Sequence, residues 1–214
     1  MNLVLRVGKK QRIILAAAAV VLVVVAAVGL VVKNTLDEKK PTKDRTQVTE
    51  VAGIPIHEAL IPEGSEGRPG YKRKIKYIVI HETANTSRGA NAKAHADYLN
   101  SGNSGSTSWH YTVDDKEIYH HIPDSEVAWH AGDKLKEDGG NLNGLSLELC
   151  VNEDGSFNRT FDNAAKFTAY LLKEYRLGIE DVKQHFDFSG KNCPMTIREK
   201  GRWNEFLDLV KQYL

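Results

Sequence analysis

One uninterrupted apolar run near the N-terminus constrains this chain more than any other feature. Residues 13–32 contain no charged and no strongly polar side chain, and Arg6, Lys9, Lys10 and Arg12 precede them. A helix that rises about 1.5 Å per residue would carry this run across about 30 Å, the thickness of the hydrocarbon core of a bilayer. A core helix would show one apolar face, whereas this run is apolar on all sides. The run therefore predicts one N-terminal transmembrane helix.

The same run is compatible with a cleaved signal peptide or with an anchor that stays. A cleaved signal has an apolar core of about 7–15 residues and a small-residue cleavage site. Residues 13–32 are longer, and Lys33 closes them without a clear site of that kind, which favours an uncleaved signal anchor. Because basic residues mark the cytoplasmic side, residues 1–12 are expected to form a cytoplasmic basic tail. The predicted localisation is the cell membrane, as a single-pass protein whose folded domain lies on the extracellular side.

The residues after the run divide into a polar segment and a compact domain. Residues 37–50 are almost entirely polar with mixed charge, so they bury too little apolar surface to offset the entropy of ordering. We therefore expect residues 33–70 to form a flexible tether and arm. The modest apolar patch at 51–61 either packs on the domain or stays loose. One compact domain is expected over residues 71–214.

The pattern within the compact domain mixes strands and helices. Short β-branched or alternating segments, typical of strands, lie at residues 75–81, 108–113, 117–122 and 144–151. Apolar residues at helical spacing, or flanking turn residues, indicate helices at residues 89–99, 161–175 and 199–213. This pattern predicts a single α/β domain with a mixed central β-sheet flanked by helices, preceded by the transmembrane helix.

The charge balance excludes one class of function. Charged residues make up 27% of the chain, yet the formal net charge is only +1. A protein that binds nucleic acid usually carries a strong basic excess, so no nucleic-acid partner is expected. The sequence indicates no particular oligomeric state.

His81, His185 and Cys193 have the side chains that a catalytic zinc site requires. His81 ends the first predicted strand of the compact domain, and the other two flank the short loop HFDFSGKNC. Catalytic zinc sites use three protein ligands and leave a fourth position open for water. The spacing of His185 and Cys193 matches no general zinc-finger pattern, and a histidine at a strand end is often structural. The residues alone therefore leave both interpretations open.

Glu148 lies in a strand whose side chains alternate between two faces. Leu145, Leu147 and Leu149 share one face, which is typical of a core, so Ser146 and Glu148 point to the other. Burying a carboxylate in an apolar strand is costly unless it has a partner or a chemical task. The pattern is compatible with an exposed strand acid and with an acid that lines a functional site.

Five segments together resemble the type 2 family of N-acetylmuramoyl-L-alanine amidases, which shares its fold with phage amidases and peptidoglycan recognition proteins. They are, in chain order, IVIHETA at 78–84, SWHYTVDD at 108–115, VAWHAGD at 127–133, LSLELCVN at 145–152 and HFDFSGKNCP at 185–194. The likeness is greatest to the amidase modules of Gram-positive autolysins and phage endolysins. The resemblance implies a zinc hydrolase that has peptidoglycan as its partner and cuts the bond between N-acetylmuramic acid and L-alanine.

The resemblance also implies roles for individual residues. In the family, a strand-end histidine, a later histidine and a cysteine or aspartate in the final loop bind one Zn²⁺ ion, and these positions are His81, His185 and Cys193 here. Family members that only bind peptidoglycan typically lack the thiol, so Cys193 favours catalysis. Glu148 would act as general base, and Lys191 would stabilise the oxyanion that forms as water attacks the amide.

The rim of the cleft is the other place where the resemblance implies contacts. His130 and Trp129 belong to the VAWHAGD segment, which borders the cleft in the family, so we expect them to bind substrate. The chain departs from the family at Trp109, where some phage members carry a catalytic tyrosine, and no catalytic tyrosine is assigned. Cys150 shares a strand face with Glu148 and is interpreted as a buried, inert thiol.

Two other functions are compatible with the sequence. A non-catalytic peptidoglycan-binding module would keep the fold without turnover, although the complete set of expected ligands and Glu148 disfavours it. A zinc peptidase that acts on stem peptides would share the chemistry, although the sequence contains no HExxH segment. The products released from the cell wall would separate these functions.

Overall fold

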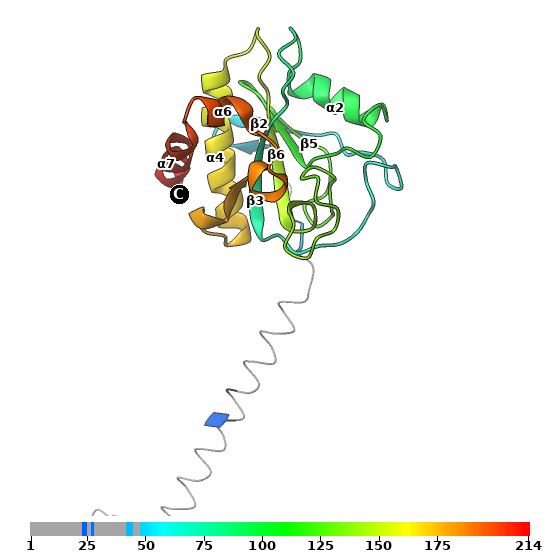
Figure 1. Cartoon of the computed structure of the whole chain (residues 1–214), viewed down its shortest axis with the longest axis vertical. Coiled ribbons are helices and arrows are strands. Elements are labelled where there is room, and N and C mark those ends of the chain that lie inside the picture. Colours follow the sequence, from blue (N-terminus) through cyan, green and yellow to red (C-terminus); the bar gives the residue numbers. More distant parts are fainter. Residues whose placement is uncertain (1–22, 25–26, 28–41, 45–47) are drawn as a thin grey trace, which may run out of the picture. The chain divides into compact units, whose positions relative to one another are not determined.

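The structure is a computed structural model that describes residues 23, 24, 27, 42–44 and 48–214. The chain divides into two units, residues 1–40 and residues 41–214. The second unit contains all the strands described below, and Figure 1 shows them as the centre of the folded domain.

Seven short strands form one sheet. They are β1 (Glu50–Val51), β2 (Ile54–Glu58), β3 (Tyr77–Glu82), β4 (Tyr111–Val113), β5 (Ile118–His120), β6 (Gly144–Leu149) and β7 (Val182–Gln184). Their spatial order is β1-β2-β5-β4-β6-β3-β7. The pairs β2–β5, β4–β6, β6–β3 and β3–β7 are parallel, whereas β1–β2 and β4–β5 are antiparallel. The sheet is therefore mixed, and the predicted single α/β domain is confirmed.

Helices cover both sides of this sheet. They are α2 (Ala92–Asn100), α3 (Gly140–Asn143), α4 (Phe157–Tyr175), α5 (Phe186–Ser189), α6 (Met195–Glu199) and α7 (Trp203–Tyr213), with a 3-10 turn at Ile179–Asp181. Figure 1 shows α4 and α7 together on one side of the sheet and α2 on the other. Leu145, Leu147 and Leu149 are fully buried in the same core cluster as the apolar residues of α4 and α7. The opposite face of β6 is thus left for polar side chains.

The helix boundaries differ from the predicted ones for local reasons. The helix predicted from residue 89 begins at Ala92, because the Asn91 side chain caps it by accepting a hydrogen bond from the Ala94 backbone. The last predicted helix, residues 199–213, begins only at Trp203, because the turn at Gly201, whose φ of +64° lies outside the helical region, separates α7 from the short α6. The spacing of apolar residues alone does not predict the cap at Asn91 or the turn at Gly201.

The apolar arm at residues 51–61 packs on the domain. Its strand β2 lies in parallel register with β5, so that Ile56 pairs with Ile118. Val51, Ile54 and Ile56 are buried in the main core cluster. Farther upstream, the Asp44 carboxylate accepts hydrogen bonds from the Ser125 backbone and hydroxyl. The arm therefore completes the sheet instead of staying loose.

The expected localisation as a single-pass cell-membrane protein is contradicted. A spanning helix needs about 20 consecutive apolar residues. In the described part of the chain, no helix is both long enough and apolar enough to meet that requirement. Of the predicted anchor, residues 13–32, only Val23, Val24 and Ala27 lie within the described residues, and the rest lies outside them.

Gly144 generates a stability prediction, because it opens β6 where there is no room for a side chain. A Cβ atom there would lie 2.5 Å from Val79 Cγ2 and 2.7 Å from the Gly140 carbonyl oxygen. Val79 is fully buried and β-branched, so it cannot move aside. Gly144→Ala should lower the free energy of unfolding by about 1–3 kcal/mol, measured by urea denaturation. Gly67→Ala is the matched control, since its Cβ would meet nothing closer than 3.5 Å; equal stability of the two variants would contradict the prediction.

Candidate metal centre and active site

The sheet and one loop bring His81, His185 and Cys193 together. His81 lies near the carboxyl end of β3, and its β6 partner in register is Glu148. The His185 backbone N–H donates to the Ile80 carbonyl, which places His185 directly after β7 and beside β3. The loop between His185 and Cys193 folds back on itself, so that the Phe186 N–H donates to the Cys193 carbonyl. The donor atoms of the three predicted ligands all lie within 4.8 Å of one another.

The chemistry of this cluster fits a metal ion. All three side chains are buried, and their donors are two imidazoles and one thiol, the set that zinc prefers. Burial lowers the pKa of His185 to about 4 and that of His81 well below its ordinary value, so both rings are neutral near pH 7. Burial also raises the pKa of the Cys193 thiol to about 12. Metal binding would therefore have to displace a proton from Cys193.

Glu148 adjoins the cluster on the face of β6 opposite the leucines, as the alternation predicts. Its Oε1 lies 3.8 Å from His81 Nδ1, and its side chain is 14% exposed. Burial raises the pKa of this carboxyl to about 8, although the positive charge of Lys191 opposes the shift. Its Oε2 atom is buried and has no hydrogen-bond partner in the described part of the chain. A carboxyl in this state can hold or release a proton near neutral pH.

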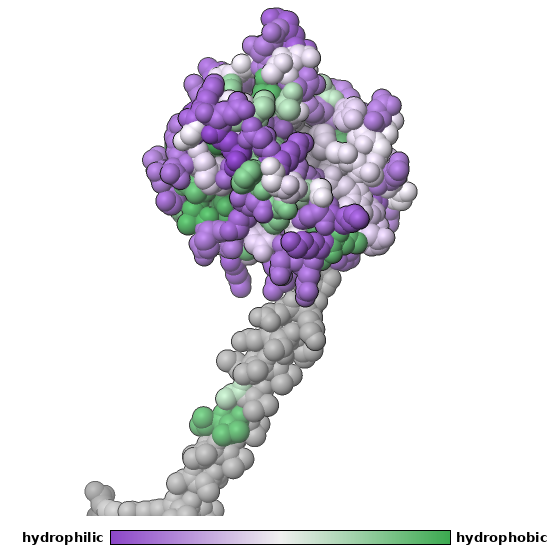
Figure 2. Space-filling view, in the orientation of Figure 1, coloured by the Kyte–Doolittle hydropathy of each residue, from purple (hydrophilic) through white to green (hydrophobic). Residues whose placement is uncertain are grey.

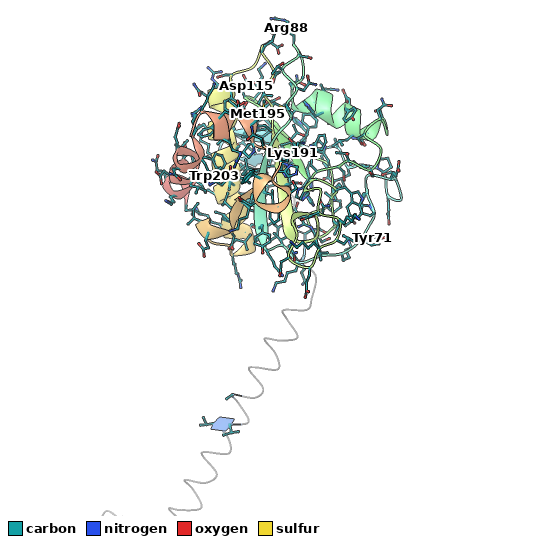
Figure 3. The ribbon with its side chains drawn as sticks, in the orientation of Figure 1. Tyr71, Arg88, Asp115, Lys191, Met195 and Trp203 are labelled. Atoms are coloured by element: carbon teal, nitrogen blue, oxygen red, sulfur yellow. The ribbon has the colours of Figure 1, made fainter. Side chains whose placement is uncertain are left out.

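A cleft of about 380 Å³ opens onto Glu148 and Lys191. Its other lining residues come from the segment after β3, from α2 and from the approach to β4, and they are Glu82, Thr83, Ala84, Asn85, Ala90, Ala94, His95, Tyr98, Thr107 and Trp109. Lys191 is exposed and lies near the middle of the face seen in Figure 3. Figure 2 shows this face as mostly hydrophilic, with small separate hydrophobic patches. The site is thus accessible to a polar substrate.

The two residues predicted on the cleft rim lie in different environments. Trp129 is half-buried and lines a second pocket of about 580 Å³ together with Leu135, and the Tyr71 ring contacts it edge-on with centroids 6.5 Å apart. His130 is buried, and its Nδ1 lies 3.0 Å from His81 Nε2. His130 therefore contacts the Nε2 side of His81, whereas Cys193 and Glu148 lie on its Nδ1 side.

Trp109 and Cys150 are both buried near the cleft. The Trp109 indole N–H donates to Thr112 Oγ1 at 2.7 Å, so that its only polar atom is engaged inside the domain. Cys150 is buried 3.9 Å from His95 Nδ1, and burial raises its pKa, as expected of an inert thiol. Neither residue brings a free acid or nucleophile to the cleft.

Glu82 is a site residue that the sequence analysis missed. Its carboxylate accepts hydrogen bonds from the backbone N–H groups of Thr196 (2.8 Å) and Ile197 (2.9 Å), at the start of α6. Its own backbone N–H points at Cys193 Sγ, 3.5 Å away. Glu82 therefore ties the cysteine-bearing loop to the strand that carries His81. The signal was available, because Glu82 is an acid at the end of an apolar strand, as unusual there as Glu148.

Comparison with protein families and with curated proteins finds N-acetylmuramoyl-L-alanine amidases in both cases. Residues 71–196 match the family described as N-acetylmuramoyl-L-alanine amidase. The chain is 41% identical over 155 residues to the Bacillus subtilis N-acetylmuramoyl-L-alanine amidase CwlH, which covers 72% of this chain and 60% of that protein. It is also 41% identical over 153 residues to the amidase XlyA of the same species, covering 72% and 50%. The chain thus spans about half to three-fifths of the length of these curated relatives.

Solved structures share the fold at similar identity. A mutant endolysin from Bacillus subtilis superposes with a TM-score of 0.70 at 42% identity, covering 73% of this chain and 99% of that one. The catalytic domain of XlyA gives a TM-score of 0.69 at 40% identity, with the same coverage.

The raised pKa of Glu148 predicts a pH dependence of stability in the metal-free protein. Near pH 7 the folded state holds a proton on Glu148 that the unfolded state has released, since the pKa rises from 4.5 to about 8. The free energy of unfolding should therefore fall as the pH rises from about 6.5 to 8, by up to about 1.4 kcal/mol per pH unit. The buried histidines have lowered pKa values, so their titration should change the free energy of unfolding mainly below this pH range.

Urea denaturation in the presence of a chelator measures this slope. Glu148→Gln cannot titrate, so its stability should stay nearly constant over the same pH range. An equal slope in both proteins would show that Glu148 does not cause it.

Proposed function

Because the chain belongs to the N-acetylmuramoyl-L-alanine amidase family, we propose that it hydrolyses the amide bond between N-acetylmuramic acid and L-alanine in peptidoglycan. The observation that carries the proposal is the buried cluster of His81, His185 and Cys193 beside the Glu148 carboxyl, whose buried Oε2 has no hydrogen-bond partner in the described part of the chain. Glu148 lines an open cleft together with Lys191, so that a bound amide can reach its carboxyl.

The three clustered residues would hold one Zn²⁺ ion. When bound, zinc supplies Lewis acidity that polarises a carbonyl and lowers the pKa of water. The residues of the chain do the rest. His81 and His185 offer neutral imidazole nitrogens, and Cys193 offers its sulfur after losing its proton. Glu82 keeps the cysteine loop against β3 through its hydrogen bonds to the start of α6.

Glu148 is the proposed general base. It accepts a proton from the attacking water and then delivers it to the nitrogen of L-alanine, which leaves as an amine. Burial raises the pKa of Glu148 to about 8 in the metal-free protein, and the charge of a bound Zn²⁺ ion would lower it, so that the carboxylate could take the proton from water and return it to the amine. Its unpartnered Oε2 leaves one oxygen free for the transfer.

Lys191 is the proposed oxyanion stabiliser. Its ammonium lines the same cleft as Glu148, and its positive charge lowers the pKa of that carboxyl against the effect of burial. The same charge would stabilise the negative oxygen that develops on the amide carbonyl during attack. The charge of Lys191 would therefore influence both the Glu148 carboxylate and the oxyanion.

Trp129 is the proposed substrate contact outside the catalytic cleft. Its half-buried ring lines the second pocket beside Tyr71, where an aromatic surface with exposed polar neighbours can pack against a sugar or peptide. We retain residues 71–214 as the proposed catalytic domain, with the arm at residues 50–58 packed on it.

A non-catalytic binding module is the second candidate, and the state of Glu148 disfavours it. A buried carboxyl without a hydrogen bond costs free energy that a module would have no reason to retain. A zinc peptidase would use the same groups, so its products must separate it from an amidase.

The test is a digest of purified peptidoglycan with the full-length protein, followed by mass spectrometry. Stem peptides that begin with a free L-alanine amine should appear, a chelator should abolish them, and added zinc should restore them. Cleavage between amino acids of the stem would indicate a peptidase. Binding to the wall without release, even with zinc added, would indicate a recognition module.

The proposed roles predict the effects of two substitutions on turnover. Glu148→Gln removes the base while it preserves shape, and it should lower kcat by about 10²–10⁴-fold. Lys191→Met removes the oxyanion charge and should lower kcat by about 10²–10³-fold. Lys200→Met removes an exposed lysine of α6's C-terminal end and serves as the control. Zinc content should stay at wild-type level in all three, and unchanged kcat in either test variant would refute the role of that residue.

A further inference from the structure

Behind the metal cluster, a hydrogen-bonded chain leads from His81 to a backbone carbonyl. His81 Nε2 lies 3.0 Å from His130 Nδ1, and His130 Nε2 lies 3.2 Å from the Gly144 carbonyl oxygen. Both rings are buried, so bulk water does not compete for these nitrogens. The other nitrogen of His81, Nδ1, faces Cys193 Sγ at 3.9 Å and Glu148 Oε1 at 3.8 Å.

The end of the chain determines the position of each hydrogen. A carbonyl oxygen only accepts, so His130 Nε2 must carry a hydrogen and donate it to Gly144. In the neutral ring, His130 Nδ1 is then an acceptor, and His81 Nε2 must be the donor that faces it. His81 is left with a free lone pair on Nδ1, the nitrogen that points at the other members of the cluster.

The segment that carries His130 is itself fixed in place. Asn141 Oδ1 accepts hydrogen bonds from the backbone N–H groups of His130 (2.8 Å) and Ala131 (2.6 Å). Asn141 Nδ2 donates to the Lys134 carbonyl, which closes the loop between them. The Ala131 backbone lies close enough to the His185 ring to oppose the lowering of its pKa. Residues 130 and 131 therefore lie beside both histidines of the cluster.

We propose that His130 is a positioning residue that fixes His81 in the one tautomer able to bind metal, and that residues 130 and 131, held by Asn141, form the outer support of the metal site. This inference rests on the proposed metal site. It differs from a role in substrate binding, because His130 acts through His81 from the interior of the domain. Substitution of a residue that hydrogen bonds a metal-bound histidine commonly lowers metal affinity by about 10–100-fold.

Two substitutions of the same residue separate this role from simple packing. In His130→Asn, the amide oxygen occupies the place of Nδ1 and still accepts the hydrogen of His81 Nε2. In His130→Gln, the amide reaches the place of Nε2 and keeps the bond to Gly144, while the acceptor that faces His81 is lost. Both replacements are neutral and polar, so a purely structural role would make them similar. His121→Gln, at a buried histidine that bonds Thr112, is the control for loss of a core imidazole.

The zinc dissociation constant of each full-length protein is measured by competition with a chromogenic chelator, and metal-free thermal melting is recorded alongside. His130→Gln should bind zinc about 10–100-fold more weakly than wild type. His130→Asn and His121→Gln should stay within a few-fold of it. Two-bond ¹⁵N–¹H spectra of the metal-free wild type should show His81 with its hydrogen on Nε2.

Each alternative outcome overturns the proposal in a recognisable way. A hydrogen on His81 Nδ1 in the wild type would refute the assigned tautomer even if every variant failed to fold. Equal zinc affinities of the Asn and Gln variants would reduce His130 to a packing residue. A wild type that binds no zinc would remove the metal site and the positioning role with it. A wild type that binds zinc tightly but releases no stem peptides would refute only the proposed amidase activity.

Discussion

The parallel pairing of β3 with β6 is the constraint on which the rest of the site depends. It sets His81 beside Glu148 at the ends of two central strands, while the leucines of β6 anchor the opposite face in the core. β7 then joins β3 on its other side and delivers His185 to the same edge. Cys193 lies farther along the chain in the loop before α6, and Glu82 holds that loop to β3.

One physical cause, burial, sets the protonation states of the whole cluster. Removing water disfavours every charged form, so the histidines become neutral and the carboxyl and thiol keep their protons. Lys191, which is exposed at the cleft, supplies the opposing positive charge that lowers the pKa of Glu148 against the effect of burial. In the metal-free protein, the site therefore combines uncharged imidazole and thiol side chains with a carboxyl whose pKa is about 8.

The sequence predicted most of the fold, because strand alternation and strand ends are local properties, whereas the grouping of His81, His185 and Cys193 was implied by the resemblance to the amidase family. It did not predict contacts that depend on partners far along the chain. The strand expected over residues 108–113 shortens to β4, because the His110 N–H donates to Ser146 Oγ instead of a ladder carbonyl. The burial of His130 follows from Asn141, and the packing of the arm follows from the open side of β5. Neither partner is identifiable from residue spacing.

The packed arm has a consequence for how the domain can be handled as a fragment. The match to the family begins at residue 71, but β2 lies upstream and covers β5. A protein cut at Tyr71 would expose the row of backbone N–H and C=O groups along β5 and remove Val51, Ile54 and Ile56 from the core. An unprotected edge strand of this kind can recruit strands from other chains. The arm thus protects the edge of β5 from pairing with other chains, and a fragment that is to stay soluble should begin upstream of Glu50.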